Sequence, residues 1–453
     1  MPSIRLKISI SGVRGVVGET LTPQLLNEFA QAFGSYVGPG RVLVGRDTRP
    51  SGAMVTHAVN AGLMATGCQP IDLGIAPVPS IQFRCATRTD IVGGIAVTAS
   101  HNPAEWNALK LLSGGGFFLN HSEATELLDI YHQGTFRRVA GDAVPQPSFD
   151  EASVEAHIDA VLAQVDVEAI RQARLRVAVD CVNGAGAEAT PLLLSRLGCH
   201  ITRINCQPSG HFARPPEPLP EHLNQLKETV ANNDAIVGFA QDADADRLAV
   251  VDENGRALEG DVMLALLVDM VLARKAGPVV VNLSTSRLIE HVAARHGAPV
   301  IRTPVGEANV VEVILSTNAV VGGEGSGGLI YPAIHPCRDS FIAMALVLES
   351  LARGESPISE RVDALPPRTM LKEALPLPTT RARRLLRELP DRFADAKLNT
   401  KDGVKASWPE GWVHVRASNT EPIVRIIVEA DDDPAAQKLK QRVVDIVREL
   451  EGR

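Results

Sequence analysis

The sequence has few aromatic residues, no paired cysteines and no long apolar run, and each absence excludes a class of protein. Aromatic residues make up 4% of the 453 residues, whereas all hydrophobic residues make up 45%. That balance is typical of an Ala-, Val- and Leu-rich α/β protein with a sizeable core. The six cysteines form no C-x-x-C pair, which favours a reduced chain over a disulfide framework. Cys199, His200 and Cys206 have a spacing that could suggest a metal knuckle, but strand residues explain it more simply.

The N-terminus lacks an apolar core of the signal-peptide type. The most apolar helical stretch, 263–272, contains Asp269 and is too short to cross a bilayer. A net charge of −8 argues against nucleic acid or an anionic membrane as the main partner. We therefore expect a cytoplasmic protein that has neither nucleic acid nor a membrane as its main partner.

The pattern of helices and strands divides the chain into four regions. Residues 1–150 alternate helices and strands and end in a polar linker at 141–148. Residues 151–256 and 257–366 continue this alternation, which indicates βαβ units and parallel or mixed sheets. The expected elements of the first three regions are helix 21–37, strand 41–45, helix 52–66, helix 154–173, strand 175–182, strand 235–240, helix 259–275, strand 279–283, helix 286–297, strand 299–303 and helix 309–316.

The Pro-rich segment Ala364-Leu365-Pro366-Pro367 precedes a fourth region, 367–453, with a different order. A strand, a helix, two strands around Val413 and Ile426, and a charged helix at 435–451 indicate an α+β domain. The predicted fold is thus three α/β domains with mixed sheets, followed by a C-terminal α+β domain.

A serine follows the buried strand expected at 93–97. Because Pro103 ends regular structure, Ser100, His101 and Asn102 should lie on a loop at the end of that strand. Such strand ends are where α/β proteins place reactive groups. A plain polar turn is the alternative.

Three aspartates, Asp242, Asp244 and Asp246, alternate with alanines between two apolar strands. Carboxylates at every second position can converge on one hard cation, and without a cation they would repel one another. An EF-hand is excluded because Arg247 and Glu253 replace its Gly and Glu. A solvated acidic loop is the alternative, and Arg247 is either a counter-ion or a ligand for an anionic group beside the metal.

Two further loops suit a sugar phosphate. The glycine-rich loop 322–328 has neither a P-loop lysine nor a dinucleotide fingerprint. Glu324 and Ser326 are its only side chains able to bind hydroxyls, and a flexible turn is the alternative. The segment 416–422, with Arg425 soon after, combines guanidinium, hydroxyl and amide groups in a compact anion nest suited to phosphate. A polar hairpin turn is the alternative there.

These motifs, in this order, resemble the α-D-phosphohexomutase superfamily over the whole chain. The supporting motifs are Ser11-Gly12-Val13-Arg14-Gly15, Gly45-Arg46-Asp47-Thr48-Arg49, Pro216-Glu217-Pro218 and Thr303-Pro304-Val305-Gly306-Glu307. The resemblance implies four domains around a central cleft and an isomerase, an intramolecular phosphotransferase. Such an enzyme moves a phosphoryl group between O6 and O1 of a hexose through a phosphoserine and a hexose 1,6-bisphosphate. The implied cofactors are Mg²⁺ and the bisphosphate as activator, and we expect a monomer or homodimer.

The resemblance also assigns roles to residues. Ser100 would carry the phosphoryl group, and Mg²⁺ would be bound by an oxygen of this phosphoserine together with Asp242, Asp244 and Asp246. The other implied catalytic residues are Arg14, His101, Lys110 and Arg247. The expected substrate-binding residues are Gly306, Glu307, Glu324, Ser326, Arg416, Ser418, Asn419, Thr420 and Arg425.

The motifs depart from the family pattern at Gly328, where many bacterial members have a histidine that is an acid/base candidate. Lys110, Glu307 and His335 are therefore the candidate bases. The first motif also reads Ile-Ser-Gly where many members have Gly-Thr-Ser-Gly or Gly-Thr-Asp-Gly. The glycine-rich loop, with the segment 335–339, resembles the phosphoglucosamine mutase branch.

The expected reaction is therefore interconversion of glucosamine 6-phosphate and glucosamine 1-phosphate. Phosphomannomutase/phosphoglucomutase activity is the alternative within the family. Two hypotheses from other classes stay open: a metal-dependent sugar-phosphate phosphatase, and a non-catalytic protein that binds sugar phosphates.

Overall fold

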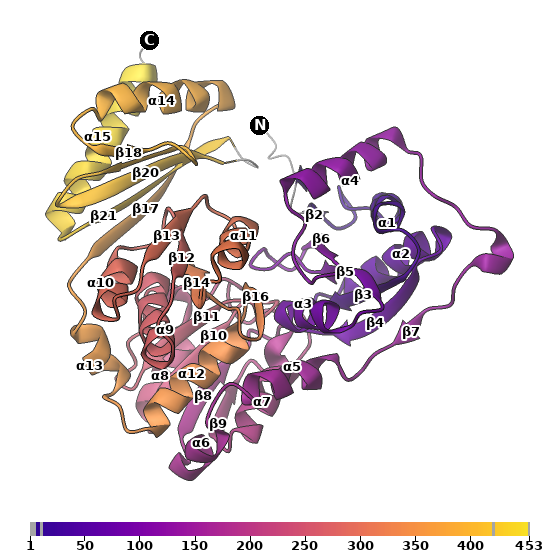
Figure 1. Cartoon of the computed structure of the whole chain (residues 1–453), viewed down its shortest axis with the longest axis horizontal. Helices are drawn as coiled ribbons and strands as arrows, with labels where there is room; N and C mark the ends of the chain where they lie inside the picture. Colours follow the sequence, from indigo (N-terminus) through magenta and orange to yellow (C-terminus); the bar gives the residue numbers. More distant parts are fainter. Residues whose placement is uncertain (1–5, 10–11, 419–421, 452–453) are drawn as a thin grey trace.

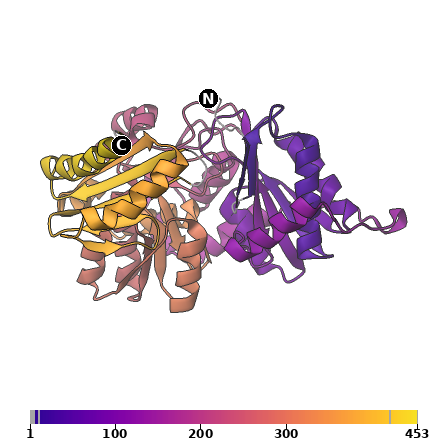
Figure 2. The same ribbon diagram turned by 90° about the horizontal axis from the view of Figure 1, so that it is seen from above.

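The computed structural model describes residues 6–9, 12–418 and 422–451, and four β-sheets follow one another along these residues. The first sheet with its helices and the C-terminal sheet lie at opposite ends of the molecule (Figures 1 and 2). The second and third sheets lie between them (Figure 1). None of the described helices has the length and apolarity needed to cross a membrane.

The first sheet has seven strands in the order β1-β2-β6-β5-β3-β4-β7. Its elements are β1 (Leu6–Ser9), β2 (Gly12–Val16), α1 (Pro23–Val37), β3 (Arg41–Arg46), α2 (Gly52–Ala65), β4 (Gln69–Ile75), α3 (Val78–Thr87), β5 (Ile91–Val97), β6 (Trp106–Ser113), α4 (His121–Gln133), a 3₁₀ turn (Gly141–Ala143) and β7 (Ser148–Phe149). β3 is parallel to β4 and β5, whereas β6 is antiparallel to both of its neighbours. The segment expected as a linker is thus partly regular, because Ser148 pairs with Ile71 of β4.

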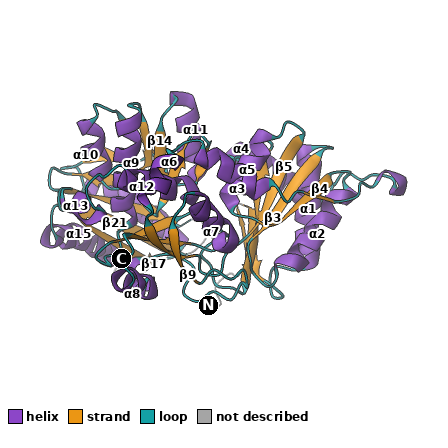
Figure 3. Ribbon diagram, turned by 90° about the horizontal axis from the view of Figure 1, so that it is seen from below, coloured by secondary structure: helices purple, strands orange, loops and turns teal. Residues whose placement is uncertain are grey.

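Helices cover both faces of the first sheet (Figure 3). Val42 and Val44 of β3 pack into one hydrophobic cluster with α1 and α2, while Leu43 packs into another with α3. This alternation is the two-residue period of a strand that is buried on both faces. It holds the end of β5, and with it the serine loop, in a rigid frame.

The second and third sheets are mixed, in the orders β11-β10-β8-β9 and β13-β12-β14-β15-β16. The second region contains α5 (Ser153–Leu162), α6 (Val167–Ala173), β8 (Arg176–Asp180), α7 (Gly186–Arg196), β9 (His200–Ile204), a 3₁₀ turn (Pro220–His222), α8 (Asn224–Asn232), β10 (Val237–Gln241) and β11 (Leu248–Asp252). The third contains α9 (Gly260–Arg274), β12 (Val279–Asn282), α10 (Leu288–Arg295), β13 (Val300–Thr303), α11 (Glu307–Thr317), β14 (Val321–Glu324), β15 (Gly328–Tyr331), β16 (His335–Arg338), α12 (Ser340–Ala352) and α13 (Ile358–Asp363). One hydrophobic cluster extends over both regions and includes most of α9 and α12.

Two sequence predictions in these regions are wrong. The single helix expected at 154–173 is two helices, because the Asp166 side chain accepts a hydrogen bond from the Ala169 N–H and starts a new helix. The glycine-rich loop is a β-hairpin: Gly322 to Glu324 belong to β14 and Gly328 begins β15, with Gly323 paired to Leu329. Only residues 325–327 form the turn.

The fourth sheet is antiparallel, in the order β17-β21-β20-β19-β18, and has its own core with two helices. Its elements are β17 (Thr369–Pro376), α14 (Thr379–Arg392), β18 (Lys397–Asn399), β19 (Val404–Ser407), β20 (Gly411–Ala417), β21 (Ile423–Ala430) and α15 (Asp433–Glu451). The predicted fold class, three mixed-sheet α/β units and a C-terminal α+β unit, is confirmed. The domain boundaries at residues 150, 256 and 366 stay a prediction.

Buried contacts dock the fourth unit on the third. Lys405 Nζ donates a hydrogen bond to the Leu283 carbonyl at 2.6 Å and lies 3.8 Å from the centre of the Trp412 ring. The pKa of Lys405 is lowered to about 6, mainly because the ammonium group is buried and also because the positive charge of Arg302 is near. The imidazole of His414 bonds Ser284 Oγ at 2.8 Å. These contacts hold β19 and β20 against the third unit.

Candidate active site

A cleft of about 600 Å³ is lined by residues from all four regions of the chain. The first region contributes His101, and the second contributes Glu217 and Arg247. The third and fourth contribute Asp261, Asn282, Ser284, Val305, Glu324, Gly325, Ser326, Lys372, Glu373, Ala374, Arg416, Ile423, Arg425 and Ile427. Most of these side chains are polar or charged, so the cleft suits a charged, hydroxyl-rich ligand.

Ser100 lies just beyond β5, buried and in the left-handed backbone region with φ of 49°. Few non-glycine residues adopt that conformation, and its cost must be met by the surrounding structure. Here the Ser100 N–H donates to Thr98 Oγ1 at 3.0 Å. The hydroxyl donates to Asp242 Oδ2, also at 3.0 Å. The serine loop and the aspartate loop therefore meet.

The backbone of the serine loop is held by Arg49, which is fully buried and paired with Asp47 at 2.9 Å. The two Nη atoms of Arg49 donate to the carbonyls of Ser100, Asn102, Pro103 and Trp106. One guanidinium thus satisfies three carbonyls of the serine loop and that of Trp106, the first residue of β6.

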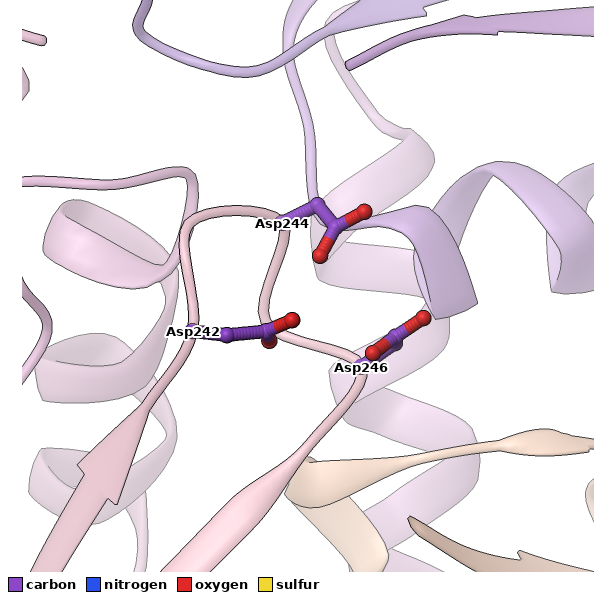
Figure 4. A group of neighbouring side chains, drawn as sticks. All are labelled: Asp242, Asp244 and Asp246. Carbon is purple, nitrogen blue, oxygen red and sulfur yellow. The ribbon is translucent and has the colours of Figure 1, made fainter. Parts of the chain in front are cut away.

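Asp242, Asp244 and Asp246 lie on the loop between β10 and β11, and their side chains point toward one another (Figure 4). One oxygen of each carboxylate lies within 4.8 Å of those of the other two. The Oδ1 atoms of Asp244 and Asp246 are buried and have no hydrogen-bond partner among the described residues. Buried carboxylate oxygens without partners are costly, and a hard divalent cation would satisfy them. The donor set, oxygen only, suits Mg²⁺.

Two cations from other elements balance this charge. Lys110 Nζ, on β6, lies 2.7 Å from Asp244 Oδ2 and 3.8 Å from Asp246 Oδ2. Arg338 Nη2, at the end of β16, lies 2.6 Å from Asp246 Oδ2. Burial raises the pKa of the Asp242 carboxyl well above its usual range, and repulsion by the other two aspartates raises it further. Burial also acts to raise the pKa of Asp244, but Lys110 and the hydrogen bonds outweigh burial, so its pKa lies below the usual range.

His101 belongs to the serine loop, and Arg14 and Arg247 lie beside it. Arg14 Nη1 donates to Asn102 Oδ1 at 2.7 Å, and Arg247 pairs with Glu217 at 2.9 Å. Burial lowers the pKa of His101 to about 3, and the positive charges of Arg247 and Arg14 act in the same direction. The imidazole is therefore neutral at physiological pH.

In the glycine-rich hairpin, residues 321–331, Glu324 is held by two donors. Its Oε1 accepts from Asn282 Nδ2 at 2.9 Å and from the Gly306 N–H at 3.0 Å. Gly306 has φ of 124°, which glycine adopts without strain. Gly306 therefore positions Glu324. Ser326 lies in the turn and lines the cleft.

The expected phosphate loop joins β20 to β21. Arg416 and Arg425 are register partners on these strands and both line the cleft. The Ser418 N–H bonds the Ile423 carbonyl and closes the end of the hairpin. Asn419 and Thr420 lie outside the described residues, as does Ser11 of the first motif.

Four family models, described as phosphoglucomutase/phosphomannomutase α/β/α domains I, II and III and C-terminal domain, match residues 5–138, 155–255, 259–369 and 376–446. The chain belongs to the phosphoglucomutase/phosphomannomutase family. The predicted membership of the α-D-phosphohexomutase superfamily is thereby confirmed, and with it the class of enzyme, an isomerase that transfers phosphoryl groups intramolecularly.

Two relatives of this family member carry different substrate names. A phosphoglucomutase/phosphomannomutase of Thermococcus kodakarensis is 38% identical over 447 residues, with 97% of each chain covered. A probable phosphoglucosamine mutase of Methanopyrus kandleri is 37% identical over 442 residues, again with 97% of each chain covered. A crystal structure of a phosphoglucomutase/phosphomannomutase family protein from Burkholderia thailandensis has a TM-score of 0.86 at 26% identity and 98% coverage of both chains.

The candidate bases of this phosphohexomutase differ in where they lie. Lys110 contacts two of the aspartates. Glu307 pairs with Arg338 at 2.8 Å, and burial raises the pKa of its carboxyl. His335 points elsewhere: its Nε2 lies 3.1 Å from the Gly116 carbonyl and its ring stacks on Phe117. Burial lowers the pKa of His335 to about 4.

Sequence reasoning missed several residues of the site. Asn282 stands at the end of β12, where the rule that reactive groups follow strands could have found it. Lys372 lies within β17 and binds Asp261 Oδ2 at 3.2 Å across the third and fourth units, and no local pattern marks it. Arg49 stands in a motif that supported the resemblance, but its role depends on contacts that only the fold reveals.

Proposed function

We propose that this protein interconverts glucosamine 6-phosphate and glucosamine 1-phosphate, with Ser100 carrying the phosphoryl group that is transferred. The observation that carries the proposal is the 3.0 Å contact between the Ser100 hydroxyl and Asp242 of a buried aspartate triad, in a cleft lined by Arg416 and Arg425. A phosphoryl group on Ser100 would lie beside the triad and Lys110. A second phosphate of the same substrate could bind the two arginines.

Asp242, Asp244, Asp246 and an oxygen of phosphorylated Ser100 would hold Mg²⁺. When bound, the metal supplies neutralisation of the negative charge on the transferring phosphoryl group. Lys110, already in contact with Asp244 and Asp246, is placed to donate hydrogen bonds to the same group. Arg247 and Arg14 add positive charge beside the serine.

In the proposed reaction, a hydroxyl of the hexose phosphate takes the phosphoryl group from Ser100, and the P–O bond to the serine breaks. The hydroxyl proton passes to a base, for which Lys110 and Glu307 remain our candidates. The product, a hexose 1,6-bisphosphate, turns end for end in the cleft. The Ser100 oxygen, giving up its proton, then attacks the other phosphoryl group. The P–O bond to the sugar breaks, the freed sugar oxygen takes up a proton, and the isomeric monophosphate leaves.

Glu324 and Ser326 would bind ring hydroxyls that keep similar positions in both orientations. Glu324 is suited to this role because Asn282 and Gly306 fix one of its oxygens. Arg416, Ser418, Asn419, Thr420 and Arg425 would bind the phosphate that does not react. Hexose 1,6-bisphosphate would act as activator by phosphorylating Ser100.

The amino-sugar assignment is supported by the relative from Methanopyrus kandleri and by carboxylates in the cleft wall. Glu217, Asp261 and Glu373 all line the cleft, each already paired with a cation, Arg247, Lys372 and Lys440 respectively. An ammonium group at carbon 2 would join these pairs. Phosphomannomutase/phosphoglucomutase activity is the second candidate, because the relative from Thermococcus kodakarensis carries that name. The cytoplasmic location and the monomeric or homodimeric state stay predictions.

The test compares kcat/KM for glucosamine, glucose and mannose 1-phosphates at fixed Mg²⁺ and bisphosphate. We expect glucosamine 1-phosphate to have the highest kcat/KM. If its kcat/KM is lower than that of glucose 1-phosphate or mannose 1-phosphate, phosphomannomutase/phosphoglucomutase activity is assigned instead. Glu324→Ala should lower all three values, because it removes a contact with shared hydroxyls, whereas Glu360→Ala, an exposed residue of α13, should change none. Release of inorganic phosphate as the main product would indicate a phosphatase.

A further inference from the structure

The side chain of Arg338 joins three carboxylates from three different elements. Its Nη2 lies 2.6 Å from Asp246 Oδ2, its Nε lies 2.8 Å from Glu307 Oε2, and its Nη1 lies 3.8 Å from Glu324 Oε2. Asp246 belongs to the aspartate loop, Glu307 begins α11, and Glu324 ends β14. Each carboxylate meets a different nitrogen of one planar guanidinium.

Gly328 makes room for this arginine. A Cβ atom at position 328 would lie 2.4 Å from Arg338 Cδ and 2.9 Å from Cγ, both closer than real Cβ contacts. The backbone of Gly328 is not in the left-handed region, so what requires glycine here is space and not conformation. The stem of Arg338 crosses the glycine-rich hairpin at Gly328, where no side chain obstructs it.

We propose that Arg338 is a positioning residue that fixes Asp246 of the aspartate loop and Glu324 of the glycine-rich hairpin relative to each other. Gly328 is required because any larger residue there would displace the Arg338 side chain. The inference rests on the proposed function, in which these two carboxylates bind metal and sugar. The buried guanidinium of Arg338 would thus set the position of the metal and the position of the sugar together.

Arg338 contributes the fixed directions of its hydrogen bonds as well as a positive charge. A lysine would keep the positive charge but offers a single ammonium on a flexible stem, which cannot meet three carboxylates in fixed directions. The charge of Asp246 would still be partly balanced, because Lys110 lies 3.8 Å from the same oxygen. Arg338→Lys therefore keeps the positive charge and removes the hydrogen-bond geometry, so it tests the geometry by itself.

The test measures Mn²⁺ binding by electron paramagnetic resonance, and KM for the best hexose phosphate, on the same purified variants. Loss of a group that orients metal ligands costs roughly 10–100-fold in metal affinity or activity. We expect Arg338→Lys to weaken Mn²⁺ binding and to raise KM, each by about tenfold or more. Arg256→Lys, an arginine that also bridges two carboxylates, Asp252 and Asp363, should change neither.

Gly328→Ala should shift both constants in the same direction, because the new methyl group displaces the arginine. Gly141→Ala, where no atom lies within 4 Å of the added Cβ, is the matched control. The double variant Gly328→Ala/Arg338→Lys should be no worse than Arg338→Lys alone, since both changes remove one arrangement.

The inference is overturned if Arg338→Lys leaves both constants within about twofold of wild type, or changes only one of them. If Arg338→Lys does not fold, Gly328→Ala decides by the same criteria. If the wild-type protein shows no mutase activity, the proposed function fails, and the Mn²⁺ measurement still shows whether Arg338 sets the aspartate loop.

Discussion

Replacing Asp242 with asparagine should separate the two effects of its carboxylate, cation binding and repulsion of its neighbours. Asparagine keeps the size of the side chain and one acceptor oxygen but removes the charge. The hydrogen bonds at stake are those from Ser100 Oγ at 3.0 Å and from the Arg247 N–H at 3.2 Å. Asp244, by contrast, is the partner of Lys110, so the same change there would break an ion pair.

The magnitude follows from the spacing of the triad. Oxygens of the three carboxylates lie within 4.8 Å of one another. At that separation and an effective dielectric constant of about 20, two ionised carboxylates would repel by about 3.5 kcal/mol. This is an upper limit, because the raised pKa of Asp242 lets its carboxyl take up a proton when no cation is bound. One hydrogen bond contributes about 1 kcal/mol. The metal-free Asp242→Asn protein should therefore be at least as stable as the metal-free wild type.

The metal-bound state should show the opposite. At a metal concentration one hundred times the dissociation constant, binding stabilises the native protein by about 2.7 kcal/mol. If loss of one anionic ligand weakens binding about a hundredfold, the same concentration stabilises it by only about 0.4 kcal/mol. The second and third regions share one hydrophobic cluster, and for a cooperative unit of their combined size these values correspond to rises in Tm of roughly 5–10 °C and 1–2 °C.

Thermal unfolding with Mg²⁺ and with EDTA measures both effects on the same preparation. Asp234→Asn, an exposed residue of the second region, is the control, and its response to Mg²⁺ should equal that of wild type. A full Mg²⁺-dependent rise in Tm for Asp242→Asn would refute the metal site, and a large loss of stability in EDTA would refute the account of repulsion.

Two other predictions concern the serine and the docking of the fourth unit. Intact-protein mass spectrometry should show partial phosphorylation that Ser100→Ala abolishes together with nearly all mutase activity; an active, unphosphorylated alanine variant would contradict this. Because the pKa of Lys405 is lowered to about 6, the unfolded chain binds more protons between pH 6 and about 10.5. Stability should therefore rise with pH over that window, by up to about 1.4 kcal/mol per pH unit from this group. Lys405→Met should remove that rise, whereas Lys397→Met, an exposed lysine of β18, should keep it.

The sequence predicts best where a local pattern and a structural rule coincide. Ser100 and the three aspartates each follow an apolar run, and loops at strand ends are where the fold brings side chains together. Several elements of the first three regions follow from the same periodicity, because central strands such as β3, β8 and β10 are buried on both faces.

Contacts between distant segments are what the sequence could not provide. The prediction of one helix at 154–173 was wrong because the Asp166 cap outweighs a continuous apolar pattern. The glycine content of 322–328 predicts a loop, since glycine favours turns, yet strand pairing, with Gly323 opposite Leu329, makes about half of this stretch strand. The contacts of Arg49, Arg338 and Lys372 join segments far apart in the chain, and no local spacing encodes them.

The central claim is that the chain moves a phosphoryl group within one hexose phosphate through Ser100. Phosphorus NMR of the protein with glucosamine 1-phosphate, Mg²⁺ and a trace of glucosamine 1,6-bisphosphate tests it directly. We predict that the resonance of the 1-phosphate gives way to that of the 6-phosphate with no inorganic phosphate released, and that Ser100→Ala leaves the spectrum unchanged. Inorganic phosphate in place of the 6-phosphate, or isomerisation by the alanine variant, would contradict it.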